Sequence, residues 1–386
     1  MTHHVLRALE LVGVAGSISS IGYYLVCFLS AAKFVKHSER PHEGGAELAP
    51  VSILKPLKGR DPEMYECFRS QCLQEYPEYE IVFGISDPQD PAVQAVERLR
   101  KEFPQHAIRL IYCDRNLGSN TKVSNLAQML VQARYEYVLV NDSDVSVPSD
   151  YLRRVVAPLA DSAVGLVTCP YRGVANETLG SKLESLGIST DFFPGVLVAR
   201  AIEGVKFGLG STLLFRREDL KAIGGFEALA DYLADDYQIG KRIADLGRRV
   251  VVSELVVDSY LPRYTFRGFL DHQLRWARTV KDERFAGYVG LAVTFGLPWA
   301  LLALVTSEGA LWAWAVIGAV VAVRFAVAGY IKNHVLRDTQ PRLLRWLWLR
   351  DILAAGVWLV SFAGRTVHWR GTVFALKGGK LARIGS

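Results

Sequence analysis

Two aspartates, one residue apart, have the spacing and chemistry to hold a divalent cation. Asp142 and Asp144 follow the apolar run Val138–Val140, whose β-branched composition is typical of a buried strand in a parallel sheet. Ligands of open α/β sheets bind beyond the carboxyl ends of the strands. Carboxylate oxygens suit Mg²⁺ and Mn²⁺, so the pair could hold a cation that bridges nucleotide phosphates. A turn that caps the next helix would explain the same residues.

Other apolar runs also end on acids. Asp87 follows Ile85 and Asp114 follows Tyr112, and acids at successive strand ends would repel one another unless a cation or hydrogen-bond donors compensated. We expect Asp87 to contact the base or ribose of a nucleotide. The alternative is a turn aspartate before Pro88.

A lysine and a second acid pair are candidates for binding phosphate and for proton transfer. Lys122 lies in the stretch 118–125, which should open a helix where free amide groups and a cation receive phosphate; a solvated surface lysine is the alternative. Asp235 and Asp236 begin another predicted helix, where the helix dipole favours acids whatever their function. One of the two could accept a proton from an attacking hydroxyl. Glycines between Phe207 and Thr212 would permit close approach of a ligand or simply form a turn.

The elements that must position these residues alternate between strands and helices. Strands are predicted at Val51–Leu54, Ile81–Ile85, Ile108–Tyr112, Tyr137–Val140 and Val164–Thr168, and helices near Pro62–Glu75, Pro91–Phe103 and Val123–Ala133. This order predicts an α/β fold with a mostly parallel sheet. No Gly-x-Gly-x-x-Gly follows the first strand, which argues against a dinucleotide cofactor.

A basic amphipathic helix is expected over residues 265–281. Apolar residues recur every three or four positions from Phe266 to Val280, and Arg267, Arg275 and Arg278 are among its cations. Such a helix suits a membrane surface, although a helix that faces a protein core has the same periodicity.

The composition indicates a membrane protein. Half of the 386 residues are hydrophobic, the mean hydropathy is +0.16, and the net charge of +6 favours anionic membrane surfaces or phosphate-bearing ligands. No nucleic-acid-binding motif is visible. The five cysteines have no zinc or disulfide spacing, so we expect reduced thiols.

Four apolar stretches are candidate membrane segments. Leu11–Ala32 is uncharged and long enough to span a bilayer, and we expect a retained anchor because Lys33, Lys36 and Arg40 follow it. These cations place the next domain in the cytoplasm by the positive-inside rule. Near the carboxyl end, the sequence predicts spans at Phe285–Ser307 and Gly309–Ile331 and a shorter segment at Ile352–Gly364, which could be re-entrant or interfacial.

With these residues in view, the chain resembles the ceramide glucosyltransferase family of membrane enzymes, which have a glycosyltransferase-A (GT-A) fold. The resemblance covers roughly Val51–Arg284. It rests on Val51–Gly59, Asp87, Asp142-Ser143-Asp144, Asp235-Asp236 and Gln273-Leu274-Arg275-Trp276, which matches the family's Gln-x-x-Arg-Trp signature except that one residue, not two, separates Gln from Arg. Residues 230–238 and Trp369-Arg370-Gly371 look closer to bacterial relatives that modify hopanoids.

The resemblance implies a role for each of these residues. Asp87 would contact uridine, Asp142 and Asp144 would serve the diphosphate and a Mg²⁺ or Mn²⁺ ion, and Asp236 would be the catalytic base. Gln273, Arg275 and Trp276 would close over the pyrophosphate and the acceptor. With Lys122, these are the expected nucleotide-sugar-binding and catalytic residues.

The resulting hypothesis is an inverting transferase that moves glucose or N-acetylglucosamine from a UDP-sugar to a hydroxyl of ceramide or a hopanoid polyol. We expect an integral protein of a bacterial inner membrane, with an anchor and linker (1–49), a cytoplasmic catalytic domain (50–264), an interface helix (265–285) and a membrane region with a basic tail (286–386). A processive polysaccharide synthase shares the same motifs, and a non-catalytic lipid-binding scaffold is a third possibility.

Overall fold

The computed structural model describes residues 2–38, 48–338, 340–369 and 372–384 and divides the chain into two compact units. The sheet unit comprises Pro41–Asn176, Gly204–Pro262 and Gly379–Ser386, and the helical unit comprises Met1–Arg40, Glu177–Glu203 and Arg263–Gly378. The expected linker after Arg40, with Pro41, Gly44 and Gly45, lies largely outside the described residues, as do Arg370 and Gly371 of the tail.

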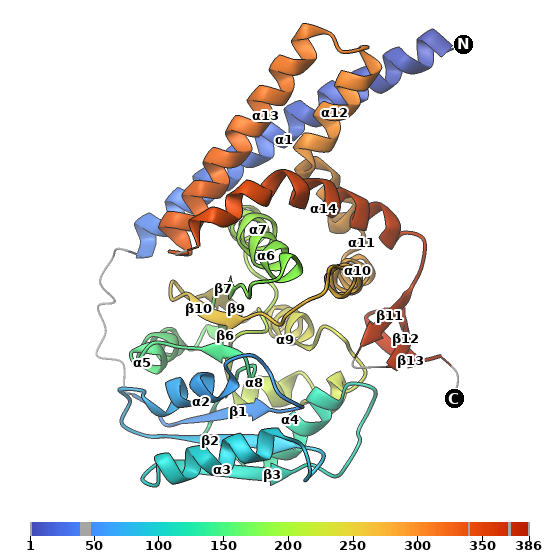
Figure 1. Cartoon of the computed structure of the whole chain (residues 1–386). Helices are drawn as coiled ribbons and strands as arrows, with labels where there is room; N and C mark the ends of the chain where they lie inside the picture. Colours follow the sequence, from blue (N-terminus) through green and yellow to red (C-terminus); the bar gives the residue numbers. More distant parts are fainter. Residues whose placement is uncertain (1, 39–47, 339, 370–371, 385–386) are drawn as a thin grey trace. The chain divides into compact units, whose positions relative to one another are not determined.

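The sheet unit is built on a mixed, mostly parallel sheet (Figure 1). Its strand order is β3-β2-β1-β4-β8-β6-β9, and only β8 runs antiparallel to its neighbours β4 and β6. The strands are β1 (Val51–Pro56), β2 (Tyr79–Ile85), β3 (Ala107–Tyr112), β4 (Tyr137–Val140), β6 (Val164–Thr168), β8 (Leu213–Arg216) and β9 (Arg249–Val252). The prediction of a mostly parallel α/β sheet is confirmed, and β4 lies at its centre.

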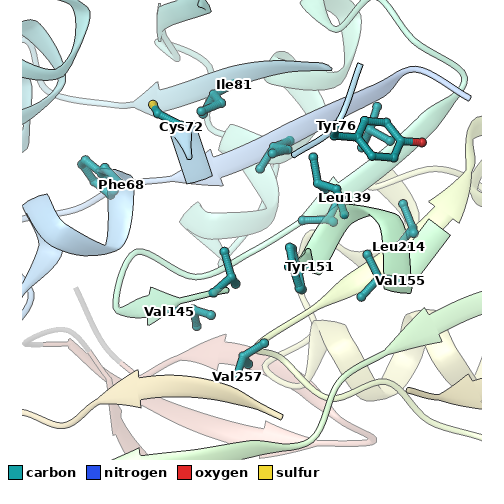
Figure 2. Close-up of a cluster of buried hydrophobic side chains, with 14 of the residues drawn as sticks. Phe68, Cys72, Tyr76, Ile81, Leu139, Val145, Tyr151, Val155, Leu214 and Val257 are labelled. Carbon is teal, nitrogen blue, oxygen red and sulfur yellow. The ribbon is translucent and has the colours of Figure 1, made fainter. Parts of the chain in front are cut away.

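Alternating side chains of the central strand enter different cores. Leu139 joins the core that contains Phe68 and Tyr151 (Figure 2), whereas Val138 and Val140 join the core on the other face. This two-residue period explains why the whole run is apolar, since both faces of the sheet are covered. The ends of β4 are therefore fixed from both sides.

Helices cover both faces of this sheet. The unit contains α2 (Met64–Cys72), α3 (Ala92–Glu102), α4 (Thr121–Gln132), α5 (Tyr151–Val156), α8 (Arg217–Ala222) and α9 (Asp235–Asp245), with the short turns η1 (Ala157–Ala160) and η3 (Glu227–Leu229). The first core takes residues from α2, α3 and α5, and the second takes them from α4, α8 and α9. A smaller sheet, β5-β10-β7, is formed by β5 (Val145–Ser146), β7 (Tyr171–Val174) and β10 (Val257–Tyr260).

The helical unit gathers segments that are distant in the sequence. Its helices are α1 (Thr2–Ser38), α6 (Leu179–Gly187), α7 (Phe193–Ile202), α10 (Phe266–Glu283), α11 (Phe285–Gly290), α12 (Gly296–Thr306), α13 (Leu311–Tyr330) and α14 (Leu347–Ser361). Shorter turns are η2 (Ile188–Phe192), η4 (Leu291–Thr294), η5 (Ile331–Val335) and η6 (Pro341–Trp346), and β11 (Thr366–Trp369) pairs antiparallel with β12 (Thr372–Lys377). Helices α1, α12 and α13 pack side by side (Figure 1).

Two helices among the described residues are long and apolar enough to cross a membrane, one from His3 to Lys36 and one from Leu311 to Val335. Helix α1 contains the expected anchor, and α13 covers most of the expected span at Gly309–Ile331. Helix α14 is shorter, at 15 residues. The candidate membrane segments thus differ in length, and a further apolar stretch is bent.

The expected span at Phe285–Ser307 is bent, with an angle of 59° between the helical pieces Phe285–Thr294 and Gly296–Thr306. Pro298 has no N–H to bond the carbonyl of Thr294, so a continuous helix loses a hydrogen bond there. Tyr24 of α1 supplies the replacement: its hydroxyl donates to the Thr294 oxygen at 2.8 Å and accepts from the Gly296 N–H at 3.2 Å. The stretch is therefore a broken span or a re-entrant loop.

A mostly buried ion-pair group, which we call the helical charge cluster, joins α13, α14 and η2. It consists of Arg324, Arg350, Asp191 and Asp351. Arg324 Nη2 lies 2.6 Å from Asp191 Oδ1 and 2.8 Å from Asp351 Oδ1, and Arg350 Nη2 lies 3.0 Å from Asp191 Oδ2. Two guanidinium groups thus face two carboxylates, which offsets the cost of burying charge in an apolar unit.

Candidate active site

The carboxyl end of β4 is held by a buried lysine from the neighbouring strand. Lys55 Nζ donates to Asn141 Oδ1 at 2.7 Å and to the Asp142 carbonyl at 2.8 Å. Asn141 in turn donates to the Ser211 carbonyl at 2.6 Å. Burial lowers the pKa of Lys55 to about 8. These bonds fix the backbone from which Asp142 projects, and the sequence alone did not single out Lys55 for this role.

Lys122 joins the two acid motifs of the sheet unit. Its ammonium lies 2.9 Å from Asp142 Oδ1 and 3.4 Å from Asp235 Oδ2. Burial alone would lower the pKa of Lys122, but these carboxylates raise it, so the lysine is firmly protonated. Asn120 starts α4 by accepting the Val123 N–H, which sets Lys122 in the first turn of the helix. Lys122 is therefore a partly buried site cation rather than a solvated surface lysine.

Asp236 and Asp142 converge on one glycine. A Cβ added to Gly210 would lie 3.1 Å from Asp236 Oδ2 and 3.6 Å from Asp142 Oδ2. The backbone N–H of Tyr237 donates to Asp236 Oδ1 at 2.8 Å and orients the carboxylate. Burial and the adjacent Asp235 raise the pKa of Asp236 to about 6. Asp236 is thus poised to exchange a proton near neutral pH, beside a glycine that leaves the approach open.

Asp144 lies on the other side of Ser143 and has a different partner. Its Oδ2 accepts from the Ser259 hydroxyl at 2.7 Å, and its carbonyl accepts the Tyr260 N–H at 3.0 Å. The Ser143 hydroxyl donates to Asp61. Burial and repulsion from Asp142 raise the pKa of Asp144 to about 6. Asp142, Asp144, Asp235 and Asp236 are called the carboxylate cluster below. These four acids outnumber the two lysines beside them, Lys55 and Lys122.

The carboxylates of Asp142 and Asp144 are the kind of ligands that would suit a Mg²⁺ ion. Within the described residues, no three or more His, Cys, Asp or Glu side chains are grouped as a metal site. Mg²⁺ commonly binds through one or two carboxylates and completes its coordination with water and substrate phosphates. Asp142 and Asp144 have the carboxylate oxygens that such an ion would use, and the excess of acids in the carboxylate cluster would favour a cation.

Asp87 lies at the expected strand end but makes local contacts. It follows β2, is exposed, and its Oδ1 accepts from the Gln89 N–H at 2.9 Å. Asp114 is likewise exposed after β3. The bond from Gln89 is the turn contact expected of an aspartate before a proline, and it leaves the second carboxylate oxygen of Asp87 available for a ligand.

The loop before Asp235 is held by the last strand of the chain. Leu381 of β13 (Lys380–Arg383) donates its N–H to the Asp231 carbonyl at 2.7 Å, and Leu233 donates to the Gly379 carbonyl at 3.1 Å. Lys380 also lies over the Tyr232 ring, 5.3 Å from its centroid. The loop that leads to the acid pair is thus clamped by residues about 150 positions away.

In the helical unit, α10 carries the signature stretch Gln273–Trp276 and contacts α6. Gln273 Nε2 donates to Glu184 Oε2 at 2.7 Å, and His272 Nδ1 lies 3.3 Å from Glu184 Oε1. The Trp276 ring packs edge-on against Phe192 with centroids 5.7 Å apart. Thr279 donates to the carbonyl of Arg275 at 2.8 Å.

Glu184 is a buried acid that sequence reasoning missed, and it orients the signature glutamine. Burial alone would raise the pKa of Glu184, but His272, Arg350 and the bond from Gln273 hold it below its usual value. The carboxylate therefore stays charged and fixes the Gln273 amide. A lone glutamate in an apolar helical segment gives no sequence signal of this pairing, which joins residues 89 positions apart.

A comparison with protein families decides the classification. The family model for glycosyl transferase family 21 matches residues 12–382. The chain belongs to glycosyl transferase family 21. This match covers the membrane segments as well as the acid motifs, so the family assignment holds for nearly the whole chain.

Relatives of this family 21 glycosyltransferase agree with the resemblance seen in the sequence. Ceramide glucosyltransferase 3 of Caenorhabditis elegans is 24% identical over 392 residues, covering 97% of this chain and 83% of the relative. A ceramide glucosyltransferase of Komagataella phaffii is 34% identical over 155 residues, which are 37% of this chain and 30% of the relative. The resemblance to ceramide glucosyltransferases is thus confirmed.

The fold of this family 21 glycosyltransferase is also that of a solved enzyme. A mannosyltransferase from Pyrobaculum calidifontis, in complex with GDP-Man and Mn²⁺, superimposes with a TM-score of 0.56 at 22% identity, covering 91% of this chain and 99% of that one. The predicted GT-A fold with additional membrane helices is confirmed.

Proposed function

We propose that the protein is an inverting membrane glycosyltransferase that moves a hexose from a UDP-sugar to a hydroxyl of a membrane lipid. The observation that carries the proposal is the convergence of Asp236 and Asp142 on Gly210, with Lys122 bridging Asp142 and Asp235. A proton acceptor, a carboxylate suited to a cation and a firmly protonated lysine are the groups that transfer from a nucleotide sugar requires.

The reaction follows from the roles of two side chains. Asp236 takes the proton of the acceptor hydroxyl while the hydroxyl oxygen forms a bond to the anomeric carbon. The bond from that carbon to the diphosphate oxygen breaks on the opposite face, so the configuration inverts and UDP leaves. Lys122 donates hydrogen bonds to phosphate oxygens, as a cation in the first turn of a helix can.

A Mg²⁺ or Mn²⁺ ion at Asp142 and Asp144 would neutralise the charge that grows on the leaving diphosphate. We propose that Asp87 binds the uridine and that Gln273, Arg275 and Trp276 contribute to binding of the donor. The hydrogen bond that Gln273 donates to Glu184 supports that role for the signature, because it pre-orients the amide.

The lipid acceptor and the location are part of the same proposal. The named activity of the relatives supports ceramide, and the hopanoid-like motifs at residues 230–238 support a hopanoid polyol as the alternative acceptor. We propose the domain organisation expected from the sequence, with the catalytic domain on the cytoplasmic side of a bacterial inner membrane. The helices at His3–Lys36 and Leu311–Val335 support an integral membrane location.

The decisive experiment incubates the purified protein in lipid nanodiscs with radiolabelled sugar nucleotides and two acceptors. UDP-glucose, UDP-N-acetylglucosamine and GDP-mannose are each paired with ceramide or a hopanoid polyol, and Asp236→Asn serves as the inactive control. We expect one lipid to gain a single sugar from a UDP-sugar. A ladder of oligomers would instead indicate a polysaccharide synthase, transfer from GDP-mannose alone would reject the UDP assignment, and failure to bind any sugar nucleotide would favour a scaffold.

A further inference from the structure

A basic cavity lies in the helical unit, between α1 and α7. Its volume is about 540 Å³, which is within the usual range for ligand pockets. Lys33 and Lys36 line it from α1 and Arg200 lines it from α7, and none of the described residues that line it is acidic. The cavity therefore concentrates positive charge.

Part of the cavity wall is formed by packed apolar side chains. Phe34 and Leu197 are buried, and the Arg200 guanidinium lies over the Phe34 ring at 4.9 Å from its centroid. This cation–π contact holds Arg200 beside the cavity. Glu203, the residue that follows α7, is paired with Arg284 at 2.8 Å.

The position of the cavity along α1 indicates what would fill it. Lys33 and Lys36 lie on one face, three residues apart, in the last part of a helix that is apolar enough to cross a membrane. Ile202, next to the lining residue Ala201, has 74% of its surface exposed. A cationic pocket with adjacent apolar surface matches an amphiphile with an anionic head and a hydrocarbon tail.

We propose that this cavity binds the phosphate of an anionic phospholipid. Lys33, Lys36 and Arg200 hold the phosphodiester, and the acyl chains lie against the apolar surface near Leu197 and Ile202. Basic pockets between membrane helices bind such headgroups by combining charge with apolar contact. The site does not depend on glycosyl transfer, because none of its residues belongs to the proposed catalytic machinery.

The test compares two charge-matched double variants of the full-length protein. Lys33→Gln/Lys36→Gln removes two lysines from the cavity, whereas Arg342→Gln/Arg345→Gln removes two exposed cations of the same unit that do not line it. Affinity for phosphatidylglycerol is measured by native mass spectrometry and by titration into phosphatidylcholine nanodiscs, with inorganic phosphate as a competitor.

The cavity variant should lose about 25-fold in affinity for phosphatidylglycerol, since each lysine near an anionic surface contributes about fivefold. The control variant should stay within about twofold of the wild type, and Lys33→Arg/Lys36→Arg, which keeps the charge, should retain binding. Equal losses in the two charge-removing variants would overturn the proposal in favour of general surface attraction. Displacement of the lipid by millimolar phosphate would show a free-phosphate site instead.

Discussion

The carboxylate cluster of the sheet unit and the helical charge cluster both bury charged side chains, but they balance them differently. In the helical charge cluster, two arginines meet two aspartates, with N–O distances of 2.6 to 3.0 Å. In the carboxylate cluster, four acids face two lysines: Lys122 pairs with Asp142 and Asp235, and Lys55 lies near Asp142 and Asp144. Burial and repulsion from neighbouring carboxylates raise the pKa values of Asp144 and Asp236 to about 6. A balanced cluster holds helices together, whereas an unbalanced one is suited to taking up a cation and a proton.

The largest expected effect is the loss of sugar transfer when a chelator removes the divalent cation proposed for the carboxylate cluster. Treatment with EDTA should reduce sugar transfer to background, and added Mn²⁺ or Mg²⁺ should restore it, because Asp142 and Asp144 would otherwise repel the donor diphosphate. The measurement is the initial rate of lipid glycosylation. Full activity in chelator would contradict the cation assignment, and unchanged thermal unfolding in EDTA would confirm that the loss is not caused by unfolding.

Removal of the proposed base should have the next largest effect. Asp236→Asn should lower kcat by about 10²- to 10⁴-fold, the usual contribution of a general base. Binding of the UDP-sugar, measured by calorimetry, should change little. Asp245→Asn, an exposed acid at the end of the same helix, is the matched control and should keep normal turnover. Wild-type kcat in Asp236→Asn would reject the assignment.

Substitutions in the helical charge cluster should lower the stability of the protein rather than its catalytic rate. Arg324→Met leaves two aspartates facing one arginine, and such an unpaired buried charge costs about 3–5 kcal/mol. The double variant Arg324→Met/Asp351→Leu removes a cation and an anion together and should recover much of that loss. Thermal unfolding in detergent separates the two. If Arg324→Met unfolds at the wild-type temperature, the cluster does not hold the helices.

The pH dependence of activity should test the raised pKa of Asp236 in the carboxylate cluster. Asp236 must be deprotonated to accept a proton, so with a pKa raised to about 6 the rate should fall as the pH drops below about 6. Lys122 opposes that shift, so Lys122→Gln should move the acidic limb of the kcat profile to higher pH. An acidic limb at the same pH in both proteins would show that Lys122 does not act on the base.

The smallest effect concerns Glu184. Glu184→Ala should lower kcat/KM for the donor by about tenfold, the value of one hydrogen bond worth about 1.4 kcal/mol. Glu184→Gln keeps an oxygen that can accept from Gln273 and should lose less. Equal and unchanged kcat/KM in both variants would show that this contact has no part in donor use.

Local patterns were sufficient to predict the elements that carry the site. The run Val138–Val140 reads as a strand because both sheet faces are buried, and the periods of the neighbouring segments predict α2, α3 and α4 closely. The order of strands and helices then predicts the fold class. These signals are contained within a few residues, so they are visible without the fold.

Contacts between distant segments could not be predicted in the same way. The bond between Gln273 and Glu184, the convergence of Asp236 and Asp142 on Gly210, and the packing of segment 177–203 with the helical unit all arise from tertiary structure. Pro298 is a local sequence feature that could have indicated the bend before α12, but the apolar composition of the stretch led to the prediction of a span. The bent conformation is stabilised by a hydrogen bond from Tyr24, which is 270 positions away from Thr294.

The hydrogen bonds between the β13 segment and the loop before Asp235 also have a consequence for the order in which the chain is made. Leu381 leaves the ribosome after every apolar helix of the chain, so the loop that leads to the proposed base cannot be secured until those helices have been made. A chain that stops within the membrane helices would carry all the acid motifs yet lack this last support. The proposed base therefore gains this support only after the candidate membrane helices have been synthesised.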